Sequence, residues 1–131
     1  MTLEYSANLR GEGSFGKLCA KLAQFMTALH IEGAAVFPPG GVRVRAIACE
    51  EYCIADGSLR DASFVHAILK IGAGRSDAAK QATCGGLFDI MKAHFAEQYA
   101  RQGLALSLEL SEFSEAGTLK YNNLHAHFNK A

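Results

Sequence analysis

Apolar and polar residues alternate in some stretches of this chain and recur at three-and-four spacing in others. Residues 3–5 alternate, which predicts a short first strand. From Phe15 to Leu29 the spacing is helical, with Ser14 as the candidate N-cap and Gly33 at the position just past the helix end. The stretch from Val42 to Cys49 is rich in β-branched residues and predicts a second strand.

The second half of the chain repeats this order of elements. Residues 63–71 predict a strand, and Ser76 or Asp77 can cap the helix that follows. Gly103 ends that helix, and leucines alternate with other residues in a final strand over 104–110. We therefore expect an α/β (α+β) fold made of a duplicated β-α-β unit. One domain over residues 1–131 would hold a four-stranded sheet with two helices on one face.

Two helices can cover only one face of such a sheet. The predicted uncovered face mixes apolar and charged residues from two strands taken as neighbours: Phe64, His66, Ile68, Arg43, Arg45 and Ile47. A face this apolar is rarely left in water, so we expect another subunit to cover it.

Composition narrows the possible partners. The 131 residues carry 13 basic and 13 acidic side chains, so there is no basic excess of the kind that nucleic acids or anionic membranes attract. No signal-peptide pattern or apolar span is present, and we expect a cytoplasmic protein. The four cysteines form no Cys-x-x-Cys pair and are expected to be reduced thiols.

Two places could bind an anion. Gly72-Ala73-Gly74-Arg75-Ser76 stands at a predicted strand-to-helix junction, where free N–H groups and an arginine favour a carboxylate, although a tight turn with a solvated arginine remains the alternative. Arg43 and Arg45 would face the same side of a strand, roughly 6.6 Å apart. They suit an anionic ligand, or else ion pairs across the sheet or an interface.

Other kinds of site find less support. His125-x-His127 has no further ligands in a metal-binding pattern, so no metal is expected. His66 is interpreted as a hydrogen-bonded interior histidine rather than a base. No Ser-His-Asp or Cys-His constellation can be argued, and Ser107 has no motif around it.

Several runs, in order along the chain, resemble the bacterial 5-carboxymethyl-2-hydroxymuconate isomerases of the tautomerase superfamily. They are Gly41-Val42-Arg43-Val44-Arg45, Phe64-Val65-His66, Leu69 to Ser76, Leu104 to Ser107 and Tyr121 to His125.

The resemblance implies a homotrimeric, cofactor-independent isomerase of homoprotocatechuate catabolism. Its reaction is a keto–enol (1,3-proton) shift on an unsaturated carboxylate substrate. It also implies that Arg43 and Arg75 are catalytic and bind carboxylates, and we expect Arg45 and Gly74 to assist binding. The family's base is an amino-terminal proline whose amine has a lowered pKa.

The chain departs from the family at its start. Members begin Met-Pro-His before an apolar strand, whereas Glu4 to Leu9 match that strand and Met1 falls on the residue after Pro-His. One hypothesis is an isomerase whose proline precedes the present start. The alternative is a proline-less, non-catalytic trimer that binds carboxylates. A purely structural oligomer would leave the convergent arginines unexplained.

Overall fold

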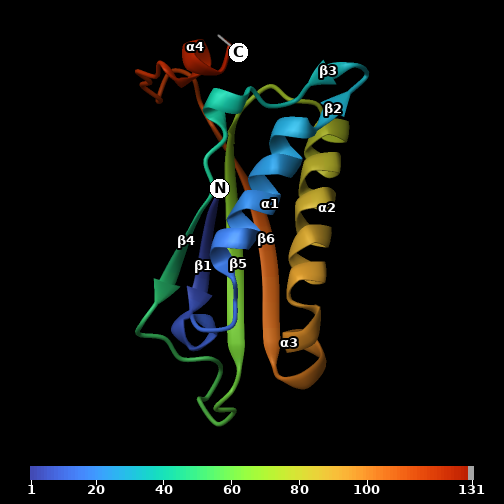
Figure 1. Cartoon of the computed structure of the whole chain (residues 1–131). Helices are drawn as coiled ribbons and strands as arrows, with labels where there is room; N and C mark the ends of the chain where they lie inside the picture. Colours follow the sequence, from blue (N-terminus) through green and yellow to red (C-terminus); the bar gives the residue numbers. More distant parts are fainter. Residues whose placement is uncertain (130–131) are drawn as a thin grey trace.

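The computed structural model describes residues 1–129. In it, two long helices pack against a mixed β-sheet (Figure 1). The sheet has four strands in the order β4-β1-β5-β6. Their bounds are β1 Thr2–Ser6, β4 Arg45–Cys49, β5 Ser63–Gly72 and β6 Leu104–Phe113. Helices α1 (Phe15–Ala28) and α2 (Asp77–His94) lie on the same face, as the duplicated β-α-β pattern predicts.

Strand β1 lies inside the sheet, with a partner on each side. It runs parallel to β4, with Thr2 opposite Arg45, and antiparallel to β5, with Thr2 opposite Ile68. Strand β5 in turn runs parallel to β6. The prediction that the strand of Arg45 neighbours the strand of His66 is therefore wrong, because β1 separates them.

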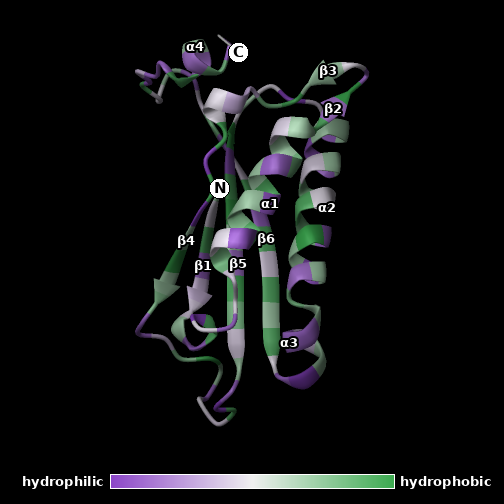
Figure 2. Cartoon of the chain, in the orientation of Figure 1, coloured by the Kyte–Doolittle hydropathy of each residue, from purple (hydrophilic) through white to green (hydrophobic). Residues whose placement is uncertain are grey.

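The core fills the space between the helices and the sheet. Alternate residues of β5 point into it and are buried, whereas the intervening ones are at least partly exposed. Along most of β6, half-buried residues alternate with exposed ones, and Figure 2 shows a matching alternation of hydropathy. Leu18 and Leu22 of α1 meet Leu87 and Met91 of α2 there, all at 0% exposure. Each such side chain stabilises the fold by about 1.5–3 kcal/mol. This packing fixes the helices across β1 and β5.

The start of α1 was placed correctly, but its cap was not. Ser14 is the residue before the helix, yet it has a left-handed φ of 47° and its hydroxyl caps no N–H group. The helix ends at Ala28, and Gly33 belongs instead to the turn of a small hairpin made by β2 (His30–Ile31) and β3 (Ala34–Ala35). Positive φ at both Glu32 and Gly33 is typical of such a two-residue hairpin turn.

The predicted strand over 42–49 begins three residues late. A 3-10 turn, η2 (Pro39–Gly41), precedes it, and residues 42–44 run as coil into β4. A second 3-10 turn, η1 (Ala7–Leu9), follows β1. At the other junction the prediction is confirmed, because the Ser76 hydroxyl accepts a hydrogen bond from the Ala79 N–H at 3.1 Å.

The carboxyl-terminal part was predicted least well. Helix α2 stops at His94, and a separate helix α3 (Ala96–Arg101) fills the distance to Gly103. Strand β6 extends three residues beyond Leu110. A coil over residues 114–123, which we call the roof segment, then leads to α4 (Leu124–Phe128). The predicted domain end at 131 lies outside the described residues.

Helix α4 packs against η2 at a buried glycine. A Cβ atom added to Gly40 would lie 2.7 Å from the backbone nitrogen of His125, so only glycine allows this approach. The Asn122 side-chain amide also donates to the Gly40 carbonyl oxygen at 3.1 Å. These contacts tie the end of the roof segment to the segment before β4.

Two adjacent glycines in α2 provide a test of the helix packing. A Cβ on Gly86 would lie 2.0 Å from the Phe25 ring of α1, whereas a Cβ on Gly85 would meet nothing within 4 Å. We expect Gly85→Ala to stabilise the protein by about 0.5–1 kcal/mol, and Gly86→Ala to destabilise it by about 1–3 kcal/mol through overpacking. Urea unfolding of both variants checks this, and equal midpoints would contradict the packing described.

Candidate active site

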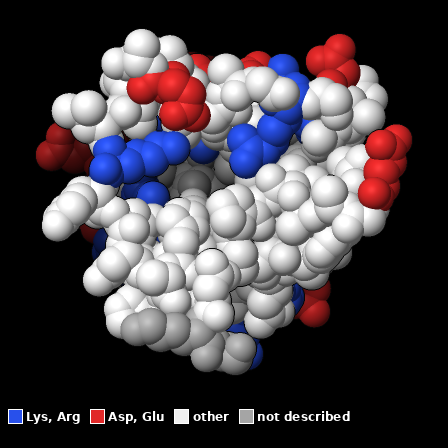
Figure 3. All heavy atoms as spheres, turned by 90° about the horizontal axis from the view of Figure 1, so that it is seen from above, with Lys and Arg blue, Asp and Glu red and all other residues white. Residues whose placement is uncertain are grey.

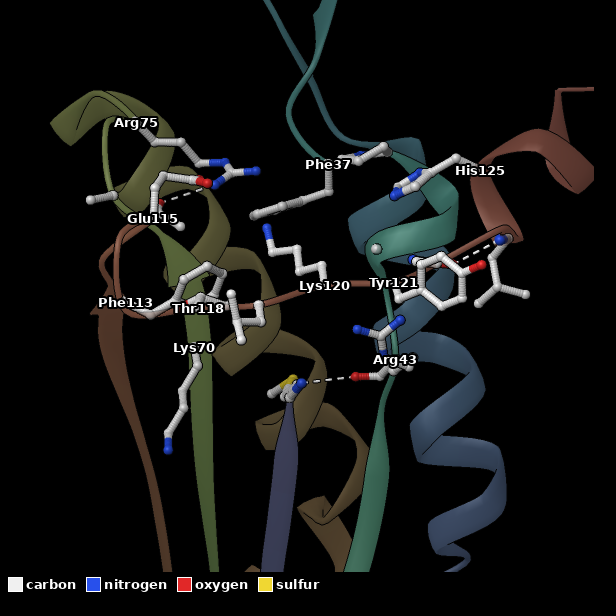
Figure 4. A pocket seen from close by; sticks show the side chains of 18 of the residues that line it. Phe37, Arg43, Lys70, Arg75, Phe113, Glu115, Thr118, Lys120, Tyr121 and His125 are labelled. Atoms are coloured by element: carbon white, nitrogen blue, oxygen red, sulfur yellow. Dashed lines mark hydrogen bonds between the residues drawn. The ribbon is translucent and has the colours of Figure 1, made fainter.

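A cavity of about 860 Å³ lies where β1 and β4 begin and where β5 and β6 end (Figure 4). Its wall comes from η2, the segment before β4, the β5–α2 junction and the roof segment. Among residues 1–129, the charged side chains that line it are five basic residues and one carboxylate: Arg43, Arg45, Lys70, Arg75, Lys120 and Glu115. Figure 3 shows basic side chains on both sides of a hollow in this surface.

The amino end of β1 reaches this cavity. The Met1 ammonium donates a hydrogen bond to the Arg43 carbonyl oxygen at 2.8 Å, and the Arg45 N–H donates to the Met1 carbonyl oxygen at 3.1 Å. Burial lowers the pKa of the Met1 α-amino group, and the charges of Arg45 and Arg43 lower it further. Burial and the two arginine charges therefore increase the neutral fraction of this amine.

Arg75 is held in place by backbone groups and an aromatic ring. Its Nε and Nη2 donate to the Val36 carbonyl oxygen at 3.3 and 3.2 Å, and its Nη1 donates to the Gly72 carbonyl oxygen at 3.2 Å. The guanidinium lies over the Phe37 ring, 4.6 Å from its centroid. A guanidinium has five N–H donors, so two remain for a ligand in the cavity. This arrangement orients the group before any ligand binds.

Arg43 is held on the opposite wall. Its Nη1 approaches the Gly40 carbonyl oxygen at 3.4 Å, a weak contact that leaves the other donors free. Arg43 precedes β4 rather than lying within it, but both Arg43 and Arg45 line the cavity. Arg43 and Arg45, from one predicted strand, thus line the same cavity as Arg75, which comes from the β5–α2 junction about thirty residues later.

Gly74 does not line the cavity, although Gly72, Ala73 and Arg75 do. Its φ of 113° is one that glycine adopts readily and other residues rarely do, so it allows the turn between β5 and α2. Its predicted contact with substrate stays a prediction. Sequence reasoning missed Lys70 and Lys120. Lys70 interrupts an apolar strand, which is a detectable signal, whereas Lys120 lies in an unpatterned coil.

His66 forms a hydrogen-bonded row with two β6 side chains. Its Nδ1 lies 2.6 Å from the Ser107 hydroxyl oxygen, and its Nε2 lies 3.2 Å from a Glu109 carboxylate oxygen. The hydrogen-bonded interpretation of His66 is confirmed, but the residue is half-exposed rather than interior. This row could not be predicted from local pattern, because Ser107 and Glu109 come next to His66 only through the β5–β6 register.

Other reactive groups do not form a second site. Within residues 1–129, no three His, Cys, Asp or Glu side chains gather as metal ligands would. His125 lines the cavity on its own. Burial raises the pKa of the Cys19 thiol, which keeps it protonated and a weak nucleophile. In the same part of the chain, no helix is long and apolar enough to cross a membrane.

Comparison with known proteins assigns the chain. Residues 1–128 match the family model described as 5-carboxymethyl-2-hydroxymuconate isomerase. A 5-carboxymethyl-2-hydroxymuconate Delta-isomerase from Escherichia coli is 38% identical over 126 residues, which cover 96% of this chain and 95% of the relative.

Solved structures agree. A 5-carboxymethyl-2-hydroxymuconate isomerase from Deinococcus radiodurans R1 superposes with a TM-score of 0.90 at 46% identity, covering 97% of this chain and 91% of that one. A member of the cis-3-chloroacrylic acid dehalogenase family shares the fold alone, with a TM-score of 0.63 at 13% identity, covering 100% and 92% of the two chains.

The fold and the comparisons thus place the chain among the isomerases of the tautomerase superfamily. Within it, the chain belongs to the 5-carboxymethyl-2-hydroxymuconate isomerase family.

The electrostatic effect on the Met1 amine can be measured directly. We expect Arg45→Met to raise the pKa of this amine toward its ordinary value, since one of the two nearby positive charges is removed while the burial remains. A smaller neutral fraction then makes the amine react more slowly with cyanate near pH 7, and mass spectrometry of the amino-terminal peptide follows that rate. Arg60→Met, in the exposed loop before β5, is the control. Identical pH–rate profiles for all three proteins would contradict this account.

Proposed function

We propose that this protein isomerises 5-carboxymethyl-2-hydroxymuconate, or a closely similar unsaturated acid, by moving the enol proton to a carbon of the diene. One observation carries the proposal. The amino end of β1 lines the same cavity as Arg43, Arg45 and Arg75. An anionic substrate fits the charge of this cavity. The lowered pKa of an amine there fits proton abstraction, because a base must be neutral before it can accept a proton.

Each group has a definite task in this reaction. A neutral amine accepts the proton of the 2-hydroxyl group, the oxygen electrons form the 2-oxo group, and the double bonds shift along the chain. The same proton, or one from solvent, then bonds to carbon. An arginine whose donors are fixed beforehand binds the 1-carboxylate and stabilises the negative charge that develops on the adjacent 2-oxygen, while a second arginine binds the carboxylate at the opposite end. The pinned guanidinium of Arg75 suits the first task.

The base we propose is a proline amine placed two residues ahead of Met1. The hydrogen bond from Met1 to Arg43 shows the direction in which the β1 ladder continues. Two more strand residues would carry an amine roughly 6.6 Å further into the cavity. Because Met1 already lines the cavity with Arg43, such an amine would lie among its basic side chains.

We also propose that the functional unit is a homotrimer and acts in the cytoplasm, in the breakdown of aromatic acids. The uncovered face of the sheet supports the trimer. Ile47 is 50% exposed there, and Phe64 and Ile68 are only half-buried in the single subunit. A second copy would remove these side chains from water.

The amine assignment has a decisive test. We expect a variant with Pro-His inserted between an initiator methionine and Met1, processed to expose the proline, to ketonise 5-carboxymethyl-2-hydroxymuconate at least about 100-fold faster than the chain without the insertion, since misplacing a reacting group by even ~1 Å costs about that much. Ultraviolet absorbance of the dienol follows the rate.

A variant with Ala-His in place of Pro-His controls for chain length. Correct processing is read from intact mass, and assembly from sedimentation. A processed, trimeric Pro-His protein that remains inert on several muconate-type dienols would refute the isomerase proposal. If that inert protein still binds dicarboxylates, a non-catalytic carboxylate-binding function takes its place.

Arg75 should contribute to binding as well as to turnover. We expect Arg75→Ala to weaken adipate binding by about 10–100-fold, which corresponds to the loss of ~1.5–3 kcal/mol from a hydrogen bond to a charged group. Isothermal titration calorimetry measures this, with Arg60→Ala as the matched control. Equal affinity in wild type and Arg75→Ala would show that the cavity does not bind carboxylates through this residue.

A further inference from the structure

Lys120 is the one basic residue of the cavity that comes from the roof segment. The backbone around it is tied down on both sides. Toward β6, the Ala73 N–H donates to the Phe113 carbonyl oxygen at 3.2 Å, and the Thr118 hydroxyl donates to the Ser114 carbonyl oxygen at 2.8 Å. Toward α4, the contacts at Gly40 fasten the segment. Lys120 is therefore held over the cavity by contacts that do not involve its own side chain.

The Lys120 ammonium has no acidic partner within residues 1–129. No carboxylate of this range lies within 4.0 Å of its Nζ. It lies instead over the Phe113 ring, 5.0 Å from the centroid. By contrast, Lys80 donates to Glu112 at 2.6 Å. A cation held by an aromatic face keeps its three donors available to a ligand.

The position of this ammonium differs from that of Lys70. Figure 4 shows the Lys120 side chain pointing toward Phe37, where the Arg75 guanidinium also lies, and the Lys70 side chain pointing away from that region. Lys70 and Arg45 also line a smaller depression on the open sheet face, with Thr2 and Glu4. Among the cations of the main cavity, Lys120 is thus the one best placed to add to Arg43 and Arg75.

The number of charged side chains in the cavity indicates what kind of ligand Lys120 would help to bind. Among residues 1–129, five basic side chains and one carboxylate, that of Glu115, line the cavity, so its charge favours a ligand with several negative charges. A muconate has two carboxylates, one at each end, and a carboxymethyl group adds a third. Two arginines account for two carboxylates, and the third needs another cation.

We propose that Lys120 binds the carboxylate of the carboxymethyl arm and so makes the cavity prefer tricarboxylates to dicarboxylates. The inference rests on the proposed function, since it names a subsite of the same cavity. Lysine suits this role because its ammonium is a compact charge on a flexible stem that can follow a branched arm. The two arginines bind the linear part of the substrate, which a dicarboxylate shares.

Binding of two saturated analogues tests the inference without turnover. Pentane-1,2,5-tricarboxylate carries the extra arm, and adipate is the same skeleton without it. We expect wild type to bind the tricarboxylate more tightly than adipate in isothermal titration calorimetry. Lys120→Met should weaken tricarboxylate binding about tenfold and change adipate binding less than twofold, and Lys120→Arg should restore most of the preference.

Lys92→Met is the matched control. Lys92 also lies over a phenylalanine ring, that of Phe88 at 5.5 Å, but it is on α2 outside the cavity, paired with Asp89. This variant should bind both ligands as wild type does. Equal losses for both ligands in Lys120→Met, or no loss for either, would overturn the inference and leave the proposed function standing. A wild-type protein that binds neither ligand would overturn both.

Discussion

The register of β1 between β4 and β5 is the constraint on which the cavity depends. An interior strand is hydrogen-bonded on both edges, so its amino end cannot move without breaking two ladders. A slip of one residue would also exchange the core face and the open face of the strand. The distance from the amino end to Arg43 and Arg45 is therefore set by the sheet itself. The chemistry at that end depends on pairing that the buried core enforces.

Positive charge is concentrated in the cavity, although the molecule as a whole has a formal net charge of zero. Bringing cations together costs free energy unless each has local compensation. Arg75 obtains it from two backbone carbonyl groups and the Phe37 ring, and Lys120 obtains it from the Phe113 ring. None of these partners carries a full negative charge. The positive potential is therefore not cancelled internally, and it remains available to an incoming anion.

Much of the fold follows from local periodicity. The two long helices, the four strands and the helical cap at Ser76 were predictable because apolar spacing and capping chemistry are local properties. The order of the strands was not, because the place of β1 between β4 and β5 depends on partners more than forty residues away. The same reason explains the missed row at His66. Its neighbours come from β6 and are adjacent only through strand register.

The cavity was predictable in part. Arg75 could be named because it stands at a predicted strand-to-helix junction, where free N–H groups favour anions. Arg43 and Arg45 could be named because they lie two residues apart on a predicted strand and so face the same side. Lys120 could not be named from the pattern, because a coil without periodicity gives no indication of where it lies. Its position depends on Gly40, a residue eighty positions earlier that admits α4 only because it has no side chain.

The anchoring of the roof segment at Gly40 has a consequence for the order in which the protein is built. All four strands and both long helices are complete once Phe113 has been synthesised, whereas the roof is attached by residues made afterwards. A ribosome that stops shortly after β6 would release a chain with the whole sheet and an open cavity. Among the described residues, the buried hydrophobic side chains run from Leu3 to Phe95, so such a chain would contain all of them and lack only the upper wall of the cavity.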